Sequence, residues 1–99
     1  MGIYMSTLTQ FLPQTGIKSV QRGLITISTS SYFNTATISA VNLSKSYINY
    51  LGSANPGGSS GAAADILCRM EFDSSTQVAA IRSGNGNGTT VSYEVVEFN

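Results

Sequence analysis

Apolar and polar residues alternate in short runs from residue 17 to the end of the chain, as they do in strands that bury one face. The alternation is strict in Thr35–Val41, where Ala or Ile occupies every second position and Thr or Ser lies between them. No stretch shows a convincing helical period. The runs predict six strands, at residues 17–28, 35–41, 45–52, 65–73, within 74–83 after a tight Ser-Ser turn, and at 89–98.

Turn-forming residues separate these runs. Residues 29–34 (TSSYFN) and 42–44 (NLS) predict a loop and a turn, and Ser53–Ala63 predicts a long exposed loop. The segment GNGNG at Gly84–Gly88 contains two Asn-Gly steps, which predict a hairpin. Short strands with a turn about every 8–12 residues are typical of an antiparallel sandwich or barrel. We predict an all-β fold, a six-stranded antiparallel β-sandwich over residues 17–99 that follows a short N-terminal arm of residues 1–16.

The register of individual strands indicates which side chains are buried. In residues 65–73 the apolar positions share one face, and the charged positions share the other. The inward set is Ile66, Cys68, Met70 and Phe72, and the outward set is Asp65, Arg69 and Glu71. We interpret Cys68 as an inert, small hydrophobic residue of the core. Gly23, inside the first strand, predicts a bulge or a close backbone approach.

The last strand carries apolar residues on both faces. Val91, Tyr93 and Val95 lie on one side, and Val96 and Phe98 lie on the other. Because one face of a two-layer sandwich is normally solvated, this surplus predicts that the second face is covered, most simply by another copy.

The first 16 residues mix apolar and polar residues without a regular period. Two interpretations stay open: a frayed terminus, or an arm that packs on a neighbouring subunit. The arm interpretation names four apolar anchors, Tyr4, Leu8, Phe11 and Leu12.

Charge excludes several classes of partner. Five Lys/Arg balance five Asp/Glu, and charged residues make up 10% of the chain, against roughly 25% in an average domain. No basic field is present to attract nucleic acid or an anionic membrane. No apolar run approaches the roughly 20 residues that a transmembrane helix needs, and the N-terminus lacks the pattern of a signal peptide. We expect neither nucleic-acid binding nor membrane insertion.

Catalytic chemistry is not indicated by any motif. The chain has no histidine, the commonest general base, and its one cysteine therefore lacks the partner of a thiol nucleophile. Carboxylates from different strands could pair as in a glycosidase, and calcium could bind near Asp73 or the Asn-Gly loop, although no acidic cluster is present. We predict no catalytic residue, no metal and no cofactor.

The motifs along residues 17–99 resemble those of a recurrent class of small tailed-bacteriophage virion proteins. The matching segments are SVQRG and ITIS near the start, TATISAV, YINYLG and SSTQVAAIR in the middle, and TTVSYEVVEF at the end. This resemblance implies a structural protein of the virion, assembled in the host cytoplasm.

A second, weaker resemblance is to the H-type lectin domain, which also opens with Val-Gln-x-Gly and closes on an aromatic-rich strand. It implies a six-stranded sandwich that assembles as a homotrimer with sugar bound between subunits. Only Val20, Gln21 and Gly23 match that motif, and their role there is structural. The Trp or His residues typical of the sugar site are absent from this chain.

We therefore expect a capsid decoration or cement protein that contacts itself and phage capsid or tail proteins. The alternatives are a tail-fibre or receptor-binding module that recognises host surface glycan, and a small neck or baseplate adaptor. Aromatic and amide side chains in the predicted loops are the candidates for glycan binding. They are Tyr32, Phe33, Asn34, Asn55, Asn85 and Asn87.

Overall fold

The computed structural model of the chain describes residues 16–55 and 63–99. The predicted anchors Tyr4, Leu8, Phe11 and Leu12 lie outside these residues. The described residues form six strands, one short 3-10 helix and one turn of α-helix. In chain order these are β1 (Ile17–Ile27), β2 (Phe33–Thr37), η1 (Leu43–Lys45), β3 (Ser46–Ala54), α2 (Ala63–Ile66), β4 (Arg69–Ser74), β5 (Gln77–Ile81) and β6 (Thr89–Phe98).

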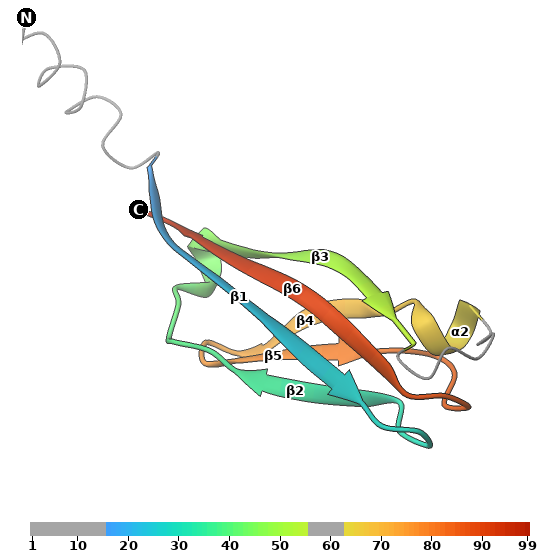
Figure 1. The fold of residues 1–99 in the computed structure, drawn as a ribbon. Coiled ribbons are helices and arrows are strands. Elements are labelled where there is room, and N and C mark those ends of the chain that lie inside the picture. Colours follow the sequence, from blue (N-terminus) through green and yellow to red (C-terminus); the bar gives the residue numbers. More distant parts are fainter. Residues whose placement is uncertain (1–15, 56–62) are drawn as a thin grey trace, which may run out of the picture.

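The strands form two antiparallel sheets of three. Sheet A has the order β1-β6-β3, and sheet B has the order β2-β5-β4. Figure 1 shows β1 and β6 side by side in one layer and β2, β5 and β4 in the other. The predicted all-β sandwich with six strands is confirmed.

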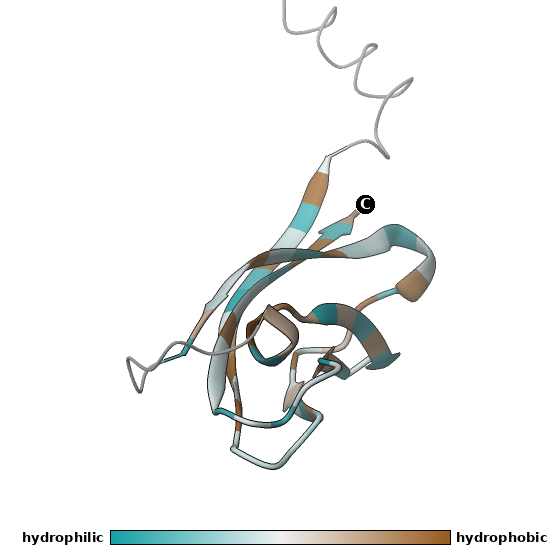
Figure 2. Cartoon of the chain, turned by 90° about the vertical axis from the view of Figure 1, so that its right-hand side faces the viewer, coloured by the Kyte–Doolittle hydropathy of each residue, from teal (hydrophilic) through white to brown (hydrophobic). Residues whose placement is uncertain are grey.

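The core lies between the two sheets and follows from the alternation in sequence. Ile25 and Ile27 of β1, Val78 of β5, and Val91 and Val95 of β6 are almost completely buried. Cys68, Met70 and Phe72 pack against this core from one side, as their register predicts. Figure 2 looks onto the end of the sandwich that carries α2 and shows the sheets as separate layers.

Strand β2 begins earlier and ends earlier than predicted. Phe33 and Asn34, expected in a loop, are its first two residues, and it ends at Thr37. Beyond Thr37 the chain leaves the ladder, and the Ile38 N–H donates to the Thr76 carbonyl in the turn after β4, at 2.9 Å. The side chain of Ile38 is nevertheless buried, so its alternating pattern reports burial rather than continued strand pairing.

The Asn-Gly segment does not form the predicted hairpin. Strands β5 and β6 belong to different sheets, so Gly84–Gly88 is part of a crossover between the layers. Asn-Gly steps favour tight turns, but the pairing of the flanking strands decides whether a hairpin results. The hairpin in sheet B instead joins β4 to β5 through Ser75–Thr76, one residue after the predicted Ser-Ser turn.

The strand predicted over residues 65–73 is also shorter. Asp65 and Ile66 belong to α2, and β4 begins at Arg69. Asp65 was expected on a solvated face but is buried. Its carboxylate is held by groups of the β5–β6 crossover, which explains why it turns inward.

Gly23 marks a close approach and not a bulge. It pairs in register with Tyr93, and the irregularity in β1 lies between Ile17 and Ser19. A Cβ at Gly23 would lie 2.5 Å from the Tyr93 hydroxyl. The tyrosine side chain therefore occupies the space that any other residue at position 23 would need.

Candidate functional site

Two of the loops predicted to bind glycan, the β1–β2 loop and the segment Gly84–Gly88, lie at one end of the sandwich, called here the loop end. It comprises the β1–β2 loop, α2 and the β5–β6 crossover, which lie together at the right of Figure 1. The Ser30 N–H donates to the Asn85 carbonyl, and the Gly84 N–H donates to the Ala64 carbonyl, both at 2.8 Å. These backbone bonds tie the crossover to each of the other two segments.

Arg82 fastens the loop end from inside. It is only 4% exposed, and its guanidinium donates hydrogen bonds to backbone carbonyls from the surrounding segments. Nε donates to Ser31 at 3.0 Å, Nη2 to Ser28 at 3.1 Å, and Nη1 to Asp65 at 2.7 Å and also to Asn87. A planar group with five donors suits this task, because several carbonyls can be satisfied from one fixed position.

Asp65 completes this arrangement with its carboxylate. One oxygen accepts from the Gly86 N–H at 3.1 Å, and the other accepts from the Asn87 side-chain amide at 3.0 Å. Acceptor and donor groups at the loop end are thus matched within the protein. Arg82 and Asp65 together fix the shape of these loops.

The amide side chains predicted to bind glycan are mostly engaged in the fold. Asn34 donates to the Thr26 carbonyl at 2.8 Å and accepts from the Thr35 N–H at 2.8 Å. The Asn87 side chain donates to Asp65, and Asn55 is half-buried. Asn85 contacts Ser30 through its backbone carbonyl. The structure therefore brings Asn85 and Asn87 together with the β1–β2 loop, but assigns Asn34 and Asn87 roles in holding strands and loops.

The aromatic candidates are more accessible. Tyr32 and Phe33 are both well exposed, and Phe33 pairs in register with Ile81 of the central strand. Beside Ile81 lies an open hollow of about 400 Å³. Its lining residues are Leu67, Arg69, Ile81, Arg82 and Ser83. This corner of sheet B presents aromatic and aliphatic surface next to an arginine.

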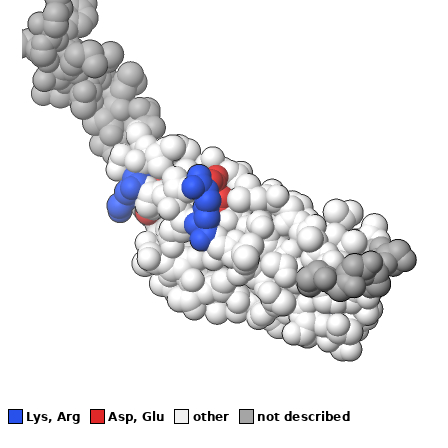
Figure 3. Space-filling view, viewed as in Figure 1, with Lys and Arg blue, Asp and Glu red and all other residues white. Residues whose placement is uncertain are grey.

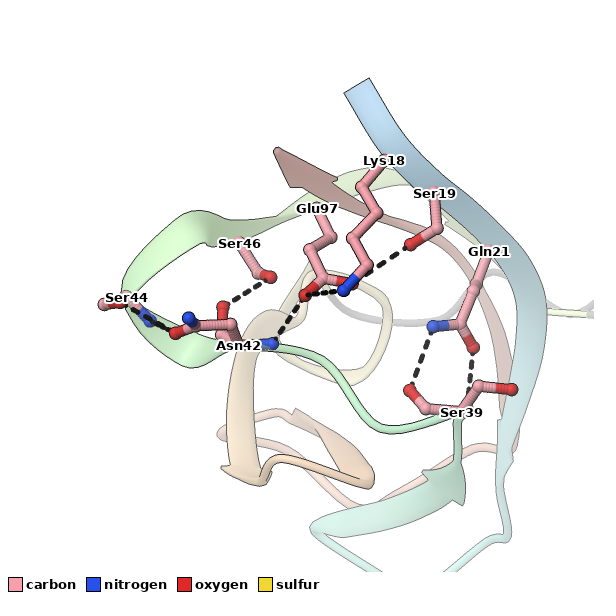
Figure 4. Close-up of polar contacts among 8 residues, drawn as sticks. All are labelled: Lys18, Ser19, Gln21, Ser39, Asn42, Ser44, Ser46 and Glu97. Carbon is pink, nitrogen blue, oxygen red and sulfur yellow. Dashed lines mark hydrogen bonds and ion pairs between the residues drawn. The ribbon is translucent and has the colours of Figure 1, made fainter. Parts of the chain in front are cut away.

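The opposite end is closed by Gln21 and Glu97, which Figure 4 shows reaching toward the segment between β2 and β3. Gln21 donates to the Ser39 carbonyl at 3.0 Å and accepts from the Ser39 N–H at 2.8 Å. The side chain thus imitates a strand partner for Ser39 and ties the segment after β2 to β1.

Glu97 is a buried carboxylate with three partners. Its Oε2 accepts from the Asn42 N–H at 2.8 Å and lies 3.8 Å from the Lys18 ammonium, while Oε1 lies 3.4 Å from the Ser19 hydroxyl. These contacts hold the start of η1 against β1 and β6. Like Arg82 at the other end, Glu97 is explained by its role in the fold.

The outer face of sheet A, the face away from the core, carries two exposed apolar rows. The β1 row consists of Val20 and Leu24, and the β3 row consists of Tyr47 and Leu51. Between them, β6 presents Val96, which pairs in register with both Val20 and Tyr47 and is buried, and the polar residues Thr90, Ser92 and Glu94. Two shallow hollows of about 310 Å³ each lie over β6, and both are lined by Leu51 and Ser92.

Charge on this outer face is neutralised within the chain. The Arg22 Nε donates to the Glu94 Oε2 at 2.7 Å, and the Asn49 amide donates to Oε1 at 2.9 Å. These hydrogen bonds, with Asn49 contributing more than Arg22, lower the pKa of Glu94. In Figure 3, the visible part of the described surface carries charged atoms in two small groups and is otherwise uncharged.

Cys68 is half-buried beside the core, as predicted. Burial raises the pKa of its thiol, although the charge of Arg82 and a hydrogen bond with Ser53 act in the opposite direction. Its sulfur also lies 3.5 Å from the Ile66 carbonyl. A raised pKa keeps the thiol protonated near neutrality and lowers its reactivity.

Within residues 16–55 and 63–99, no group of three or more His, Cys, Asp or Glu side chains is placed to hold a metal ion. Nor does this part of the chain contain a helix long and apolar enough to cross a membrane. No protein-family model, curated protein or solved structure matches the chain. The likeness to phage virion proteins and to H-type lectins stays a prediction from short motifs.

Sequence reasoning missed two features. The burial of Arg82 could have been suspected because it directly follows the apolar run VAAI at residues 78–81, in which Val78, Ala79 and Ala80 are all buried. The alternation in residues 65–73 gave no such signal for Asp65. The sequence indicated an apolar outer face of sheet A only through the apolar residues on both faces of its last strand. Their arrangement depends on β1 and β3 flanking β6, which is a matter of topology.

Proposed function

We propose that the chain is a non-enzymatic structural protein of a tailed-bacteriophage virion. In this proposal it is a capsid decoration or cement protein that assembles as a homotrimer on the particle surface. The observation that carries the proposal is the outer face of sheet A, where exposed leucine, valine and tyrosine surround a neutralised ion pair. Such a surface favours association with protein over recognition of a charged ligand.

The mechanism would be mechanical. Each copy buries apolar area against its neighbours and the shell, at roughly 25 cal/mol per Å², and many copies together raise the barrier to shell opening. The Arg82 and Glu97 contacts support this role because they fix both ends of a small domain that has no disulfide.

The arm would supply the contact with the shell. Gly16, the last residue of the arm, accepts a 2.9 Å hydrogen bond from the Asn99 N–H, so the arm joins the sandwich beside the last residue of the chain. Phe11→Ala and Leu12→Ala are expected to weaken association with particles while leaving the sandwich folded. Normal particle binding by a chain that lacks residues 1–15 would contradict this role for the arm.

Copy number tests the proposal. Quantitative mass spectrometry of purified particles should find the chain at a number comparable with the major capsid protein. A few dozen copies or fewer would instead assign it to a tail fibre, neck or baseplate. Its absence from particles would refute the virion role.

A receptor-binding module that recognises host surface glycan is the second candidate. The specific observation in its favour is the exposure of Tyr32 and Phe33 at the loop end, since aromatic faces stack on sugar rings. A glycan array compares the wild type with Tyr32→Ala and Phe33→Ala, and with Leu43→Ala as an exposed control at the other end. Binding that is lost only in the two aromatic variants would favour this candidate, and no binding by the wild type would exclude it for the glycans on the array.

A further inference from the structure

We infer that the outer face of sheet A is the surface through which copies of this chain assemble, with the β1 row of one copy packed against the β3 row of the next. The inference rests on the proposed structural role in that copies are expected to assemble. The inference adds which surface the copies use and which two rows on that surface contact each other.

The two rows provide complementary halves on one face. Leu24 lies in register beside Ser92, and Leu51 lies beside the same serine on the other side, where β3 bulges between Tyr50 and Gly52. A leucine from a neighbouring copy can therefore enter the hollow over Ser92 and contact Leu24 and Leu51, which both border it. A contact that joins two different rows is heterologous, and heterologous contacts form a ring when the rotation between copies closes; the proposed trimer is such a ring.

The charges on the face permit this association. Arg22 and Glu94 form their ion pair within each copy at 2.7 Å, and Asn49 fills the remaining oxygen of the carboxylate. Identical faces therefore meet without a net charge of either sign. An unpaired charge at this position would oppose burial.

The size of the face favours two contacts per copy. Three strands of about ten residues cover roughly 33 by 14 Å, or about 460 Å². A standard interface buries about 800 Å² per partner, so one pair of rows holds two copies weakly. In a closed ring both rows of every copy are in contact, so the area that each row buries adds to the stability of the ring.

The test uses the purified full-length chain in analytical ultracentrifugation over a wide range of concentration. The wild type is expected to sediment as an oligomer, three times the chain mass of 10.4 kDa if the ring is a trimer. Leu24→Glu and Leu51→Glu should each raise the dissociation constant at least tenfold, because each places a charge in an apolar contact. Their leucines are 66% and 53% exposed, so the sandwich should stay folded, as circular dichroism would verify.

Two leucines of similar exposure provide matched controls away from this face. Leu67, 63% exposed, follows α2, and Leu43, 47% exposed, lies in η1. Leu67→Glu and Leu43→Glu should sediment as the wild type does. If either control dissociates the oligomer while Leu24→Glu and Leu51→Glu leave it intact, a different surface is the interface and the inference is overturned.

A mixture tests the pairing of the two rows. The Leu24→Glu chain keeps an intact β3 row, and the Leu51→Glu chain keeps an intact β1 row. Mixing them should produce a two-chain complex that neither variant forms alone, and a mixture that stays monomeric would overturn the pairing. A wild type that is monomeric at all concentrations would overturn the whole inference without bearing on whether the chain occurs in particles.

Discussion

Replacing Arg82 tests how the loop end is held together. In Arg82→Met a side chain of similar length stays in the buried space, but the carbonyls of Ser28, Ser31 and Asp65 lose their donor. Hydrogen bonds from a charged donor contribute about 1.5–3 kcal/mol each and do not add fully. Removing one partner from a buried charged network costs about 3–5 kcal/mol, so we expect Arg82→Met to lower the free energy of unfolding by about that amount.

This loss is large for a domain of this size, whose whole stability is about 5–15 kcal/mol. Urea denaturation followed by circular dichroism and tyrosine fluorescence measures it. Arg82→Lys keeps the charge but not the planar fork, and it should lose less than Arg82→Met. Arg69→Met is the control, because Arg69 is well exposed and its 3.8 Å ion pair with Glu71 is expected to contribute less than about 1 kcal/mol. An Arg82→Met variant within about 0.5 kcal/mol of the wild type would refute the reasoning.

Three further predictions follow from single positions. Gly23→Ala should destabilise the fold by about 1–3 kcal/mol in thermal or urea denaturation, because the new Cβ meets the Tyr93 ring; a stability equal to the wild type would contradict this. Because its pKa is lowered, Glu94 should contribute its full stability above about pH 4.3 and lose it as the pH falls through the folded value. In an NMR titration, Asn49→Ala should move the Glu94 midpoint upward, and an unchanged midpoint would contradict the assigned cause. Cys68, whose pKa is raised by burial, should be alkylated more slowly in the folded protein at neutral pH than in urea, as mass spectrometry can follow; equal rates would contradict it.

The strands were predictable because burial of one face leaves a period of two in the sequence. Strand β6 spans the predicted residues, since its alternation runs from Thr89 to Val95 and apolar residues continue on its other face at Val96 and Phe98. Strand β2 was misplaced because Ile38 continues the alternation after the ladder has ended. Its side chain is buried in the core, although its backbone pairs with no strand and bonds instead to Thr76 in the turn after β4. A pattern of burial cannot distinguish these two causes.

The candidate site depended on long-range contacts that no local pattern records. Gly84–Gly88 has the composition of a hairpin, and only the assignment of β5 and β6 to different sheets makes it a crossover. The alternation predicts that Asp65 points outward. Its carboxylate is instead buried, because it accepts hydrogen bonds from Gly86 and Asn87, more than 20 positions away in the sequence. Tyr32 and Phe33 are exposed, but Phe33, expected in a loop, is the first residue of a strand.

The central claim is that copies of this sandwich assemble through the outer face of sheet A on a virion. A cryo-electron microscopy reconstruction of purified particles tests it most directly. The account predicts density for rings of this fold on the capsid, with Leu24 of one copy in contact with Leu51 of the next. Particles without such density, or copies whose sheet A faces solvent, would contradict it.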